Sequence, residues 1–378
     1  MPKKSKKIKN INLAKIRIIG VGGAGGNAAT RMNEDFPRGV DSVVINTDIQ
    51  DLNFCVARKK VYIGKNLTKG LGTGMNPDLG RQAAEENQAE IAEALSGADM
   101  VFLTAGFGGG TGTGALPIVA DIAKDLGILT VAVITKPFMF EGFERKRVAD
   151  EGIMRIKDKV DTLITIPNDR IFSVINKNTP LTKAFEAVDE ILKNSVIGVA
   201  DLIATTGIIN VDFADVRAII QNAGSAIIGI GKATGGERAA TAAHLAINSP
   251  LLEISIDGAK RILFSVSGHR DLKMSEVNDV ARMISEHANS SAKIIFGAHH
   301  DRKLKKGELK VTLIAADFNG DSVKISNNGI LPNLFISEEI VPANETKESG
   351  KKEKKEKNEE EKSDDVYDIP AFLRKKRK

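Results

Sequence analysis

The chain has 378 residues, of which 42% are hydrophobic and 27% are charged, values typical of a folded protein with a substantial core. This length allows about two to three domains. The single cysteine, Cys55, excludes a disulfide scaffold and a cysteine-based zinc site. Aromatic residues make up only 4%, which disfavours base stacking on single-stranded nucleic acid.

The net charge of +5 is concentrated at the two ends of the chain. Residues 1–10 contribute +5 and Arg374–Lys378 contribute another +5, which leaves −5 for the residues between them. A basic folded body that binds nucleic acid is therefore disfavoured, whereas the basic ends can contact an acidic partner or an anionic membrane. We find no apolar stretch of about 18 residues and no signal-peptide core, and we expect a cytoplasmic protein.

The first half of the chain alternates apolar runs with helical stretches. Apolar runs separated by helices are typical of a parallel sheet covered on both faces. We therefore predict a doubly wound α/β domain, whose ligands bind where strands end and helices begin. The predicted strands are Ile16–Ile19, Val43–Asn46, Met100–Thr104, Leu129–Ile134 and Leu163–Ile166.

A long helix and a second, smaller α/β or α+β domain follow. Thr179 and Pro180 are suited to the N-cap and first position of the helix, and Gly207 to the position after its end. In the second domain we predict helices Phe213–Ala223, Arg238–Ile247 and Met274–His287 and strands Ile262–Val266, Lys293–Phe296 and Lys310–Ala315. The predicted organisation is a basic disordered N-terminus (1–13), a nucleotide-binding domain (14–180), a connecting helix (181–207), a C-terminal domain (208–320), an extended segment (321–346), a charged disordered linker (347–365) and a docking peptide (366–378).

Two glycine-rich loops follow predicted strands. The first, Gly20–Asn27, matches G-x-G-x-x-G, whose glycines let the backbone approach a phosphate at a helix N-terminus. This loop alone also fits a nicotinamide-dependent oxidoreductase, with Asp48 near the distance expected for a ribose contact. The second, Gly106–Gly114, is a richer anion-binding nest that such an enzyme does not need. Two loops at one crevice favour a di- or triphosphate, and the usual P-loop is absent.

The stretch Gly108–Gly114, G-G-G-T-G-T-G, resembles the signature of the tubulin/FtsZ family. Asn210–Arg217 is similar to the catalytic loop of that family, and Asp368–Arg374 to its C-terminal peptide. The resemblance to the bacterial cell-division GTPases of this family runs from about residue 14 to 320 and resumes at the C-terminal peptide. It implies a GTP-hydrolysing cytoskeletal protein that polymerises head to tail and forms the division ring at midcell, under the inner membrane.

The resemblance also assigns the nucleotide site. It implies that Glu141 reaches the ribose, that Arg145 reaches the phosphates and that Asn168, Phe185 and Asp189 hold the guanine. By spacing alone, Glu141 and Arg145 would be a solvated pair on one helix face, and Phe185 a core residue. The full set of expected nucleotide contacts is Gly22, Gly23, Ala24, Gly25, Gly26, Asn27, Asn46, Thr47, Asp48, Gly72, Thr73, Gly74, Gly108, Gly109, Gly110, Thr111, Gly112, Thr113, Gly114, Glu141, Arg145, Asn168, Phe185 and Asp189. Ala24 fits such a loop only if its φ is negative.

Hydrolysis is assigned by the resemblance to Asn210, Asp212 and Asp215, supplied by the neighbouring subunit. From the sequence alone, an N-cap role for Asp212 and a first-turn role for Asp215 explain the pair equally well. Mg²⁺ on the phosphates is expected, with K⁺ as a further candidate, and no protein side chain is assigned as a metal ligand.

Partner binding is expected at the C-terminal peptide, where membrane adaptors and regulators would contact Asp368, Ile369, Pro370, Phe372, Leu373 and Arg374. The other expected partner is a further copy of the chain, with no nucleic acid and no membrane span. Alternatives are a tubulin-superfamily paralogue used in plasmid segregation or cell shape, a non-catalytic scaffold, and the oxidoreductase above.

Overall fold

The structure is a computed structural model that describes residues 14–37, 39–173, 175, 179–205, 207–249, 255–301 and 303–318. All of these belong to one unit of the chain, Met1–Asn327. The predicted N-terminal segment 1–13 and the predicted segments 321–346, 347–365 and 366–378 lie outside the described residues. Among the helices described, none is long and apolar enough to cross a membrane.

Six parallel strands form the first part of the sheet, in the order β3-β2-β1-β4-β5-β6. All five predicted strands are confirmed. The sequence did not reveal β3, because two of its four residues are lysines, as is common on a sheet edge. The bounds are β1 Ile16–Val21, β2 Val40–Asn46, β3 Lys59–Tyr62, β4 Met100–Gly106, β5 Leu129–Lys136 and β6 Thr162–Pro167.

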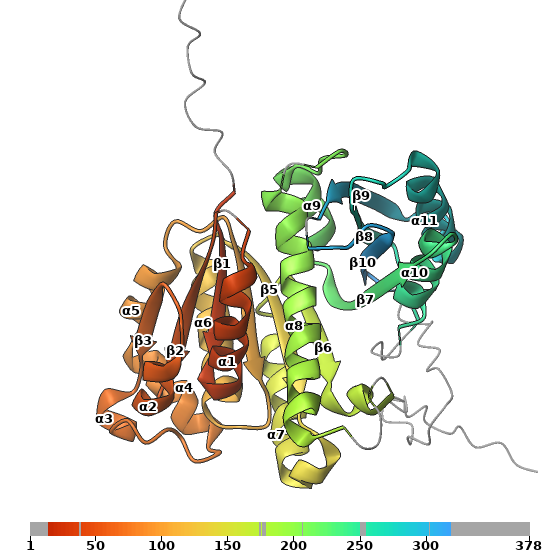
Figure 1. The fold of residues 1–378 in the computed structure, drawn as a ribbon. Helices are drawn as coiled ribbons and strands as arrows, with labels where there is room; N and C mark the ends of the chain where they lie inside the picture. The colour runs from red at the N-terminus through yellow and green to blue at the C-terminus, as the bar shows by residue number, and fades with distance from the viewer. Residues whose placement is uncertain are drawn as a thin grey trace, which may run out of the picture. The chain divides into compact units, whose positions relative to one another are not determined.

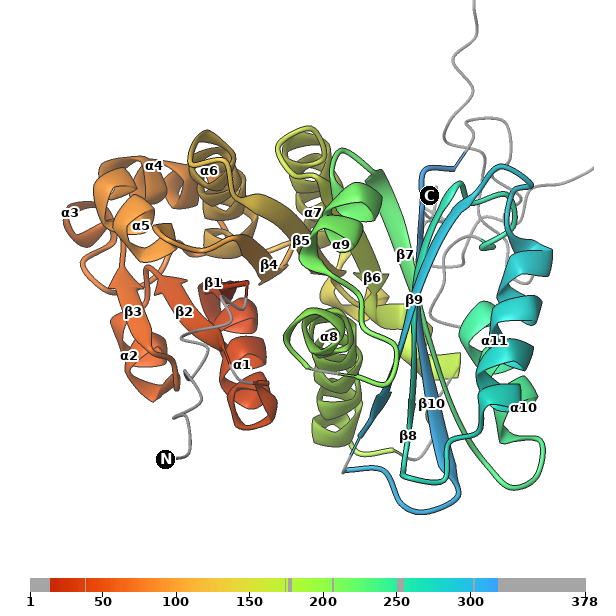
Figure 2. The ribbon, with the colours of Figure 1, turned by 90° about the horizontal axis from the view of Figure 1, so that it is seen from above.

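Helices cover both faces of these strands, as predicted for a doubly wound domain (Figure 2). Ile16 and Ile18 face the helices α1 and α8, whereas Ile19 and Val21 face the layer of α4, α5, α6 and α7. This alternation follows from the two-residue period of a strand. The bounds are α1 Gly22–Met32, η1 Asn33–Asp35, α2 Ile49–Phe54, α3 Lys65–Thr68, α4 Pro77–Glu86, α5 Gln88–Leu95, α6 Thr111–Asp125, η2 Met139–Glu141, α7 Phe143–Ile156 and η3 Asn168–Ser173.

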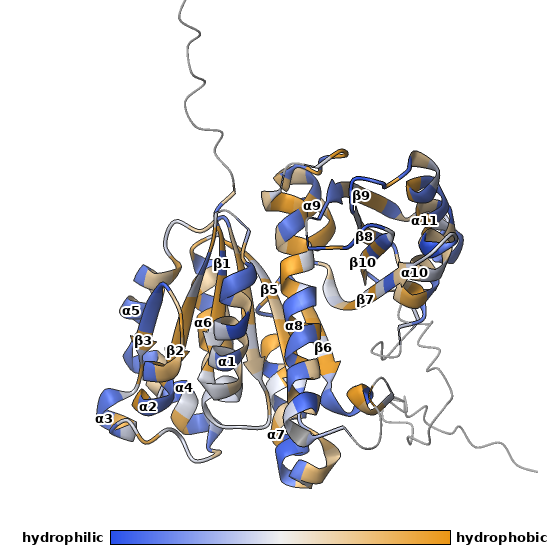
Figure 3. Ribbon diagram, viewed as in Figure 1, coloured by the Kyte–Doolittle hydropathy of each residue, from blue (hydrophilic) through white to orange (hydrophobic). Residues whose placement is uncertain are grey.

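The long helix α8 spans Leu181–Ala204 and lies beside α1 (Figure 1). Its 24 residues correspond to a length of about 36 Å. The predicted caps were wrong: extended Pro180 occupies the N-cap, so Thr179 precedes it, and Thr205 rather than a glycine ends the helix. Figure 3 shows more hydrophobic residues in the half that ends at Ala204, where Val196, Val199 and Ala200 are buried.

The C-terminal part continues the same sheet rather than forming a separate one. Strand β7 pairs in parallel with β6 through Thr162–Ile164, and the order continues β7-β10-β8-β9. Strand β10 is antiparallel to β7 and β8, and β9 is parallel to β8. The bounds are α9 Phe213–Ile220, β7 Gly224–Thr234, α10 Arg238–Ile247, β8 Arg261–Gly268, α11 Met274–His287, β9 Lys293–His300 and β10 Glu308–Ala316.

Most predicted elements of this part are confirmed, and α10 and α11 have the predicted bounds. Helix α9 ends earlier than predicted, at Ile220, and β7 was not predicted at all. The glycines of β7 obscure its apolar pattern, yet two of them are needed for packing. A Cβ at Gly229 would lie 2.0 Å from the Ala246 carbonyl oxygen, and one at Gly231 would lie 1.9 Å from that of Ala242, both on α10.

Candidate functional site

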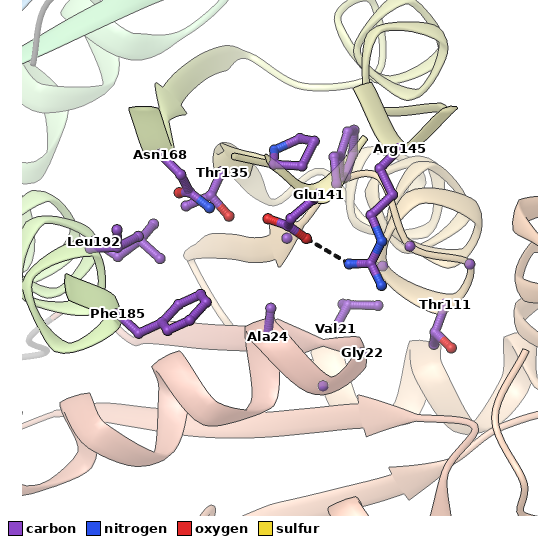
Figure 4. Close-up of a pocket in the computed structure, with 18 of the residues that line it drawn as sticks. Val21, Gly22, Ala24, Thr111, Thr135, Glu141, Arg145, Asn168, Phe185 and Leu192 are labelled. Carbon is purple, nitrogen blue, oxygen red and sulfur yellow. Dashed lines mark hydrogen bonds and ion pairs between the residues drawn. The ribbon is translucent and has the colours of Figure 1, made fainter. Parts of the chain in front are cut away.

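A cavity of about 440 Å³ lies where the strand order reverses, between the ends of β1 and β4. This is the position at which open α/β sheets bind ligands. Helices α1 and α6 both begin at the cavity, and α8 contributes a third wall (Figure 4). The lining residues are Val21, Gly22, Gly23, Ala24, Thr73, Gly106, Phe107, Gly109, Gly110, Thr111, Gly112, Thr135, Pro137, Glu141, Arg145, Asn168, Phe185, Val188, Asp189 and Leu192.

One end of the cavity is built from the N-termini of two helices. No described side chain caps α1 or α6, so the first N–H groups of both helices are left for a ligand. Gly22 has φ +71°, which requires glycine at the turn from β1 into α1. Ala24 is not among the residues with positive φ, as the sequence analysis required. Its methyl group fits because residue 106 is glycine: a Cβ there would lie 2.7 Å from Ala24 Cβ.

Three threonines join the predicted loops behind this end. The Thr111 hydroxyl lies 2.7 Å from that of Thr47 and 3.1 Å from that of Thr73, and all three side chains are buried. The segments Asn46–Asp48, Gly72–Gly74 and Gly108–Gly114, from which nucleotide contacts were expected, are thus held together at this end. Of the first two segments, only Thr73 lines the cavity.

Several predicted contacts have structural roles outside the cavity. Asp48 caps α2 by accepting from the amides of Gln50 and Asp51, and Asn46 donates to Asp51 at 2.6 Å. Burial, followed by the charge of Asp48, raises the pKa of the Asp51 carboxyl.

The glycines that do not line the cavity serve backbone packing and turns. A Cβ at Gly25 would lie 2.3 Å from the Thr104 carbonyl oxygen, and one at Gly114 would lie 1.9 Å from that of Pro77. The predicted residues that do not line the cavity are Gly25, Gly26, Asn27, Asn46, Thr47, Asp48, Gly72, Gly74, Gly108, Thr113 and Gly114.

Asn168, Phe185 and Leu192 lie at the other end of the cavity, away from Arg145 and Thr111 (Figure 4). The buried Asn168 Oδ1 has no hydrogen-bond partner among the described residues. Phe185 is 40% exposed and packs edge-on against Phe138, so the alternative that it is a core residue is wrong. The Asp189 carboxylate forms an ion pair with Arg31 of α1. This end therefore offers an amide, an aromatic ring and a carboxylate to a planar ligand.

Glu141 and Arg145 form an ion pair of 2.7 Å between the two ends (Figure 4). The expectation that they share one helix is wrong. Glu141 ends η2, Gly142 turns the chain with φ +100°, and Arg145 lies in α7. The second Glu141 oxygen accepts from the Phe138 amide at 2.9 Å, which fixes the carboxylate at the cavity wall.

The predicted catalytic residues lie elsewhere. Asp212 is the N-cap of α9, and its Oδ1 accepts from the Asp215 amide at 2.8 Å. Asn210 Oδ1 accepts from the Gly207 amide at 2.6 Å. None of the three lines the cavity, and all three are exposed. Asp189, at the cavity, precedes the end of α8 at Ala204 by 15 residues, which is a rise of about 22 Å.

Comparison with known proteins decides the family. The model of the tubulin/FtsZ family GTPase domain matches residues 15–176, and that of the FtsZ family C-terminal domain matches residues 224–319. An empty FtsZ dimer from M. jannaschii is 44% identical, with 85% of this chain and 95% of that chain covered and a TM-score of 0.78. The chain belongs to the tubulin/FtsZ family. It is a GTPase that binds guanine nucleotide. It is also a cytoskeletal protein involved in cell division.

Other solved structures agree with this tubulin/FtsZ assignment. A tryptophan-to-tyrosine mutant of FtsZ from M. jannaschii is 47% identical, covering 80% of this chain and 91% of that chain with a TM-score of 0.78. CetZ1 from Haloferax volcanii, at 20% identity, 81% and 95% coverage and a TM-score of 0.71, shares the fold. The family assignment decides against the oxidoreductase alternative, whereas a bacterial source stays a prediction.

Several residues that line the cavity of this tubulin/FtsZ GTPase were not among the expected nucleotide contacts. Thr135 and Pro137 end β5 and follow it, where ligands bind in such sheets, so strand-end position could have revealed them. Val188 and Leu192 share a face of α8 with Phe185 and Asp189, at a spacing of three to four residues. Phe107 gave no signal, because an aromatic residue inside a glycine loop matches no phosphate-binding pattern.

Proposed function

We propose that GTP binds with its phosphates at the N-termini of α1 and α6 and its guanine against Asn168, Phe185 and Asp189. Uncapped helix N-termini favour phosphate. The Asp189 carboxylate can accept from guanine N1–H and N2–H₂, donors that adenine lacks. The unpartnered Asn168 Oδ1 is a buried acceptor that a ligand donor would satisfy. Arg145 supplies positive charge beside the phosphates, and Glu141 is placed for the ribose hydroxyls.

The described residues contain no group of three or more His, Cys, Asp or Glu that could hold a metal ion. Mg²⁺, with K⁺ as a further candidate, would therefore be bound mainly through the phosphates, beside Thr73 and Thr111 at the cavity wall. The ion would offset the negative charge that develops during phosphoryl transfer.

We infer that the hydrolytic acids act on the nucleotide of a neighbouring copy. The observation that supports this is the placement of the cavity and of Asp212 toward opposite ends of α8 (Figure 1). A side chain reaches only several ångströms, so Asp212 cannot contact a nucleotide in its own cavity. Head-to-tail contact between copies brings the two together and propagates a filament.

An exposed apolar rim beside the cavity supports this assembly. Met139, Phe140, Phe143 and Phe172 are 77%, 62%, 80% and 55% exposed, and they belong to or follow the segments that supply Glu141 and Asn168. Neighbouring exposed apolar side chains are typical of a surface that another protein covers. A second copy that places its Asp212 loop over the cavity would cover this rim and exclude water from the phosphates.

In the assembled site, Asp212 and Asp215 would polarise and orient the attacking water. Asp212 uses Oδ1 to cap α9, which fixes the carboxylate against the helix rather than leaving it on a mobile loop. The capping role and the catalytic role are therefore compatible.

Complementation tests the shared site. We expect an Asp212→Asn variant and an Asp189→Ala variant each to hydrolyse GTP slowly. An equimolar mixture should recover activity, because about one junction in four joins an intact cavity to an intact acid loop. A mixture no more active than its components would contradict a site shared between copies.

We further propose that the protein works in the cytoplasm at midcell, within the division ring. Docking of membrane adaptors is assigned to Asp368–Arg374, which lie outside the described residues. Removal of residues 366–378 should abolish adaptor binding in a pull-down while GTP turnover and sedimentation are retained. Loss of turnover on removal would contradict a pure docking role.

A further inference from the structure

The segment that carries the catalytic acids lies along the edge strand β9. The amides of Ile208 and Ile209 both donate to the Ala298 carbonyl oxygen, at 2.7 and 3.1 Å. The Ala298 amide donates back to the Ile209 carbonyl oxygen at 3.1 Å, which completes an antiparallel bridge. The next residues in the chain include Asn210, Asp212 and Asp215. The register of the bridge therefore determines the position from which the chain enters the catalytic segment.

Two glycines allow the close approach. A Cβ at Gly207 would lie 2.5 Å from the Ala298 carbonyl oxygen and 3.2 Å from His299 Cβ. A Cβ at Gly297 would lie 2.7 Å from Leu202 Cδ2 and 3.1 Å from Val211 Cγ2. The contact of Gly207 is with backbone, which cannot rotate away, whereas that of Gly297 is with the end of a flexible leucine.

We propose that backbone pairing with β9 positions the catalytic segment, and that Gly207 is a positioning residue for GTP hydrolysis. The inference rests on the proposed role of Asp212 and Asp215 in the site of the next copy. A methyl group at residue 207 must move the segment away from Ala298 by about 1 Å to reach ordinary van der Waals contact. A displacement of that size at a catalytic group can lower the rate by about 10²-fold.

A simpler alternative is that the segment only protects the edge of the sheet, since exposed edge strands invite aggregation. The two roles make different predictions. Edge protection predicts that a change at Gly207 lowers the melting temperature and promotes aggregation, with turnover per assembled subunit unchanged. Positioning predicts that turnover falls while GTP binding and assembly persist.

The test compares Gly207→Ala with Gly236→Ala. Gly236 is a matched control, because it lies in a loop of the same part of the chain and a Cβ there would meet no atom within 4 Å. We expect Gly207→Ala to lower kcat by about 10- to 100-fold, with GTP affinity and the sedimented fraction within about twofold of wild type. Gly236→Ala should match wild type in all three.

Wild-type kcat in Gly207→Ala, or a loss of kcat only in proportion to lost assembly, would overturn the proposal. If Gly207→Ala does not fold, as judged by thermal unfolding, Gly297→Ala replaces it. That variant should fold because Leu202 can shift. It should still lower kcat about threefold or more with unchanged GTP affinity, because the new Cβ would lie 3.1 Å from Val211 Cγ2 and 3.3 Å from the Ile209 carbonyl oxygen of the segment. Unchanged kcat in Gly297→Ala would then overturn the proposal.

Mixing separates this inference from the proposed function. Gly207→Ala has an intact cavity and a displaced acid segment, so mixing it with Asp189→Ala should raise turnover, as mixing with Asp212→Asn does. If the Asp212→Asn mixture recovers activity but Gly207→Ala alone is fully active, the positioning role of β9 and Gly207 is wrong and the shared site holds. If neither mixture recovers activity, the shared site itself is wrong.

Discussion

Asp189 and Asp212 are connected by a single helix and lie toward its opposite ends. Asp189 lines the cavity from the first half of α8, whereas Asp212 caps α9 beyond the C-terminal end of α8. Helix α8 is continuous from Asp189 to Ala204 and has a buried face, so it cannot fold back to bring the two carboxylates together. The chain thus presents a binding site at one place and candidate catalytic acids at another.

Asp212→Asn separates the capping role of this residue from its proposed chemistry. Asparagine caps helices about as well as aspartate, so we expect a stability change below about 0.5 kcal/mol. The carboxylate charge is lost, and turnover should fall by about 10²-fold or more. Phosphate release and thermal unfolding measure the two effects. Exposed Glu286→Gln on α11 is the control for charge removal, and equal turnover in both variants would exclude a catalytic role.

Asp189→Asn should change which base is bound. An amide in place of the carboxylate can no longer accept two hydrogen bonds from guanine N1–H and N2–H₂, but it can donate to the C2 carbonyl oxygen of xanthine. We expect GTP affinity to fall by about 10²-fold and xanthosine triphosphate to bind better than GTP. Titration with both nucleotides measures this, and an unchanged preference for GTP would show that Asp189 does not read the base.

Asp35 connects three elements. Its carboxylate forms ion pairs with Lys193 of α8 and with Lys303, which lies between β9 and β10. These lysines hold the pKa of Asp35 below its usual value. A double-mutant cycle of Asp35→Asn and Lys303→Gln should give a coupling of about 0.5–1 kcal/mol at low salt, because the pair is partly exposed, and less at 1 M salt. Additive effects at both salt concentrations would show that the contact contributes nothing to stability.

Asp201, on α8, makes the folding stability of the protein depend on pH in a defined direction. Burial raises the pKa of this carboxyl to about 6, opposed by nearby Lys310 and Lys303 and supported by Asp301. The folded state therefore binds a proton that the unfolded state releases, and the stabilisation present below about pH 4 is lost as the pH rises through 6. Asp201→Asn removes this loss, so its stability relative to wild type should increase between about pH 4 and 6 and stay constant above about pH 7. Urea unfolding at several pH values measures the difference, and a constant difference contradicts the assignment.

The strands that build the cavity could be predicted because each is buried and apolar. The runs that became β1 and β4 lead into glycine-rich loops, and those ends meet at the reversal of strand order. Strand β7 could not be predicted, because Gly229 and Gly231 are explained only by the close approach of α10. Such long-range packing leaves no local pattern in a single sequence.

The same limit applies to the site. Gly22 and Gly25 look alike in the sequence, yet Gly22 turns the chain at the cavity and Gly25 makes room for the backbone of β4. The pairing of Glu141 with Arg145 was expected from helix spacing, but the structure makes it across a turn at Gly142. The pairing of the catalytic segment with β9 could not be predicted either, because residues 207–209 and 298 are far apart in the chain.

The most direct test of the central claim is GTP turnover per molecule measured against protein concentration. A site shared between copies predicts turnover near zero at low concentration and a rise above a threshold at which filaments sediment, with Asp212→Ala binding GTP and sedimenting but turning over slowly. Turnover per molecule that stays constant from the lowest to the highest concentration would contradict the account, because it would place the catalytic acids and the nucleotide within one chain.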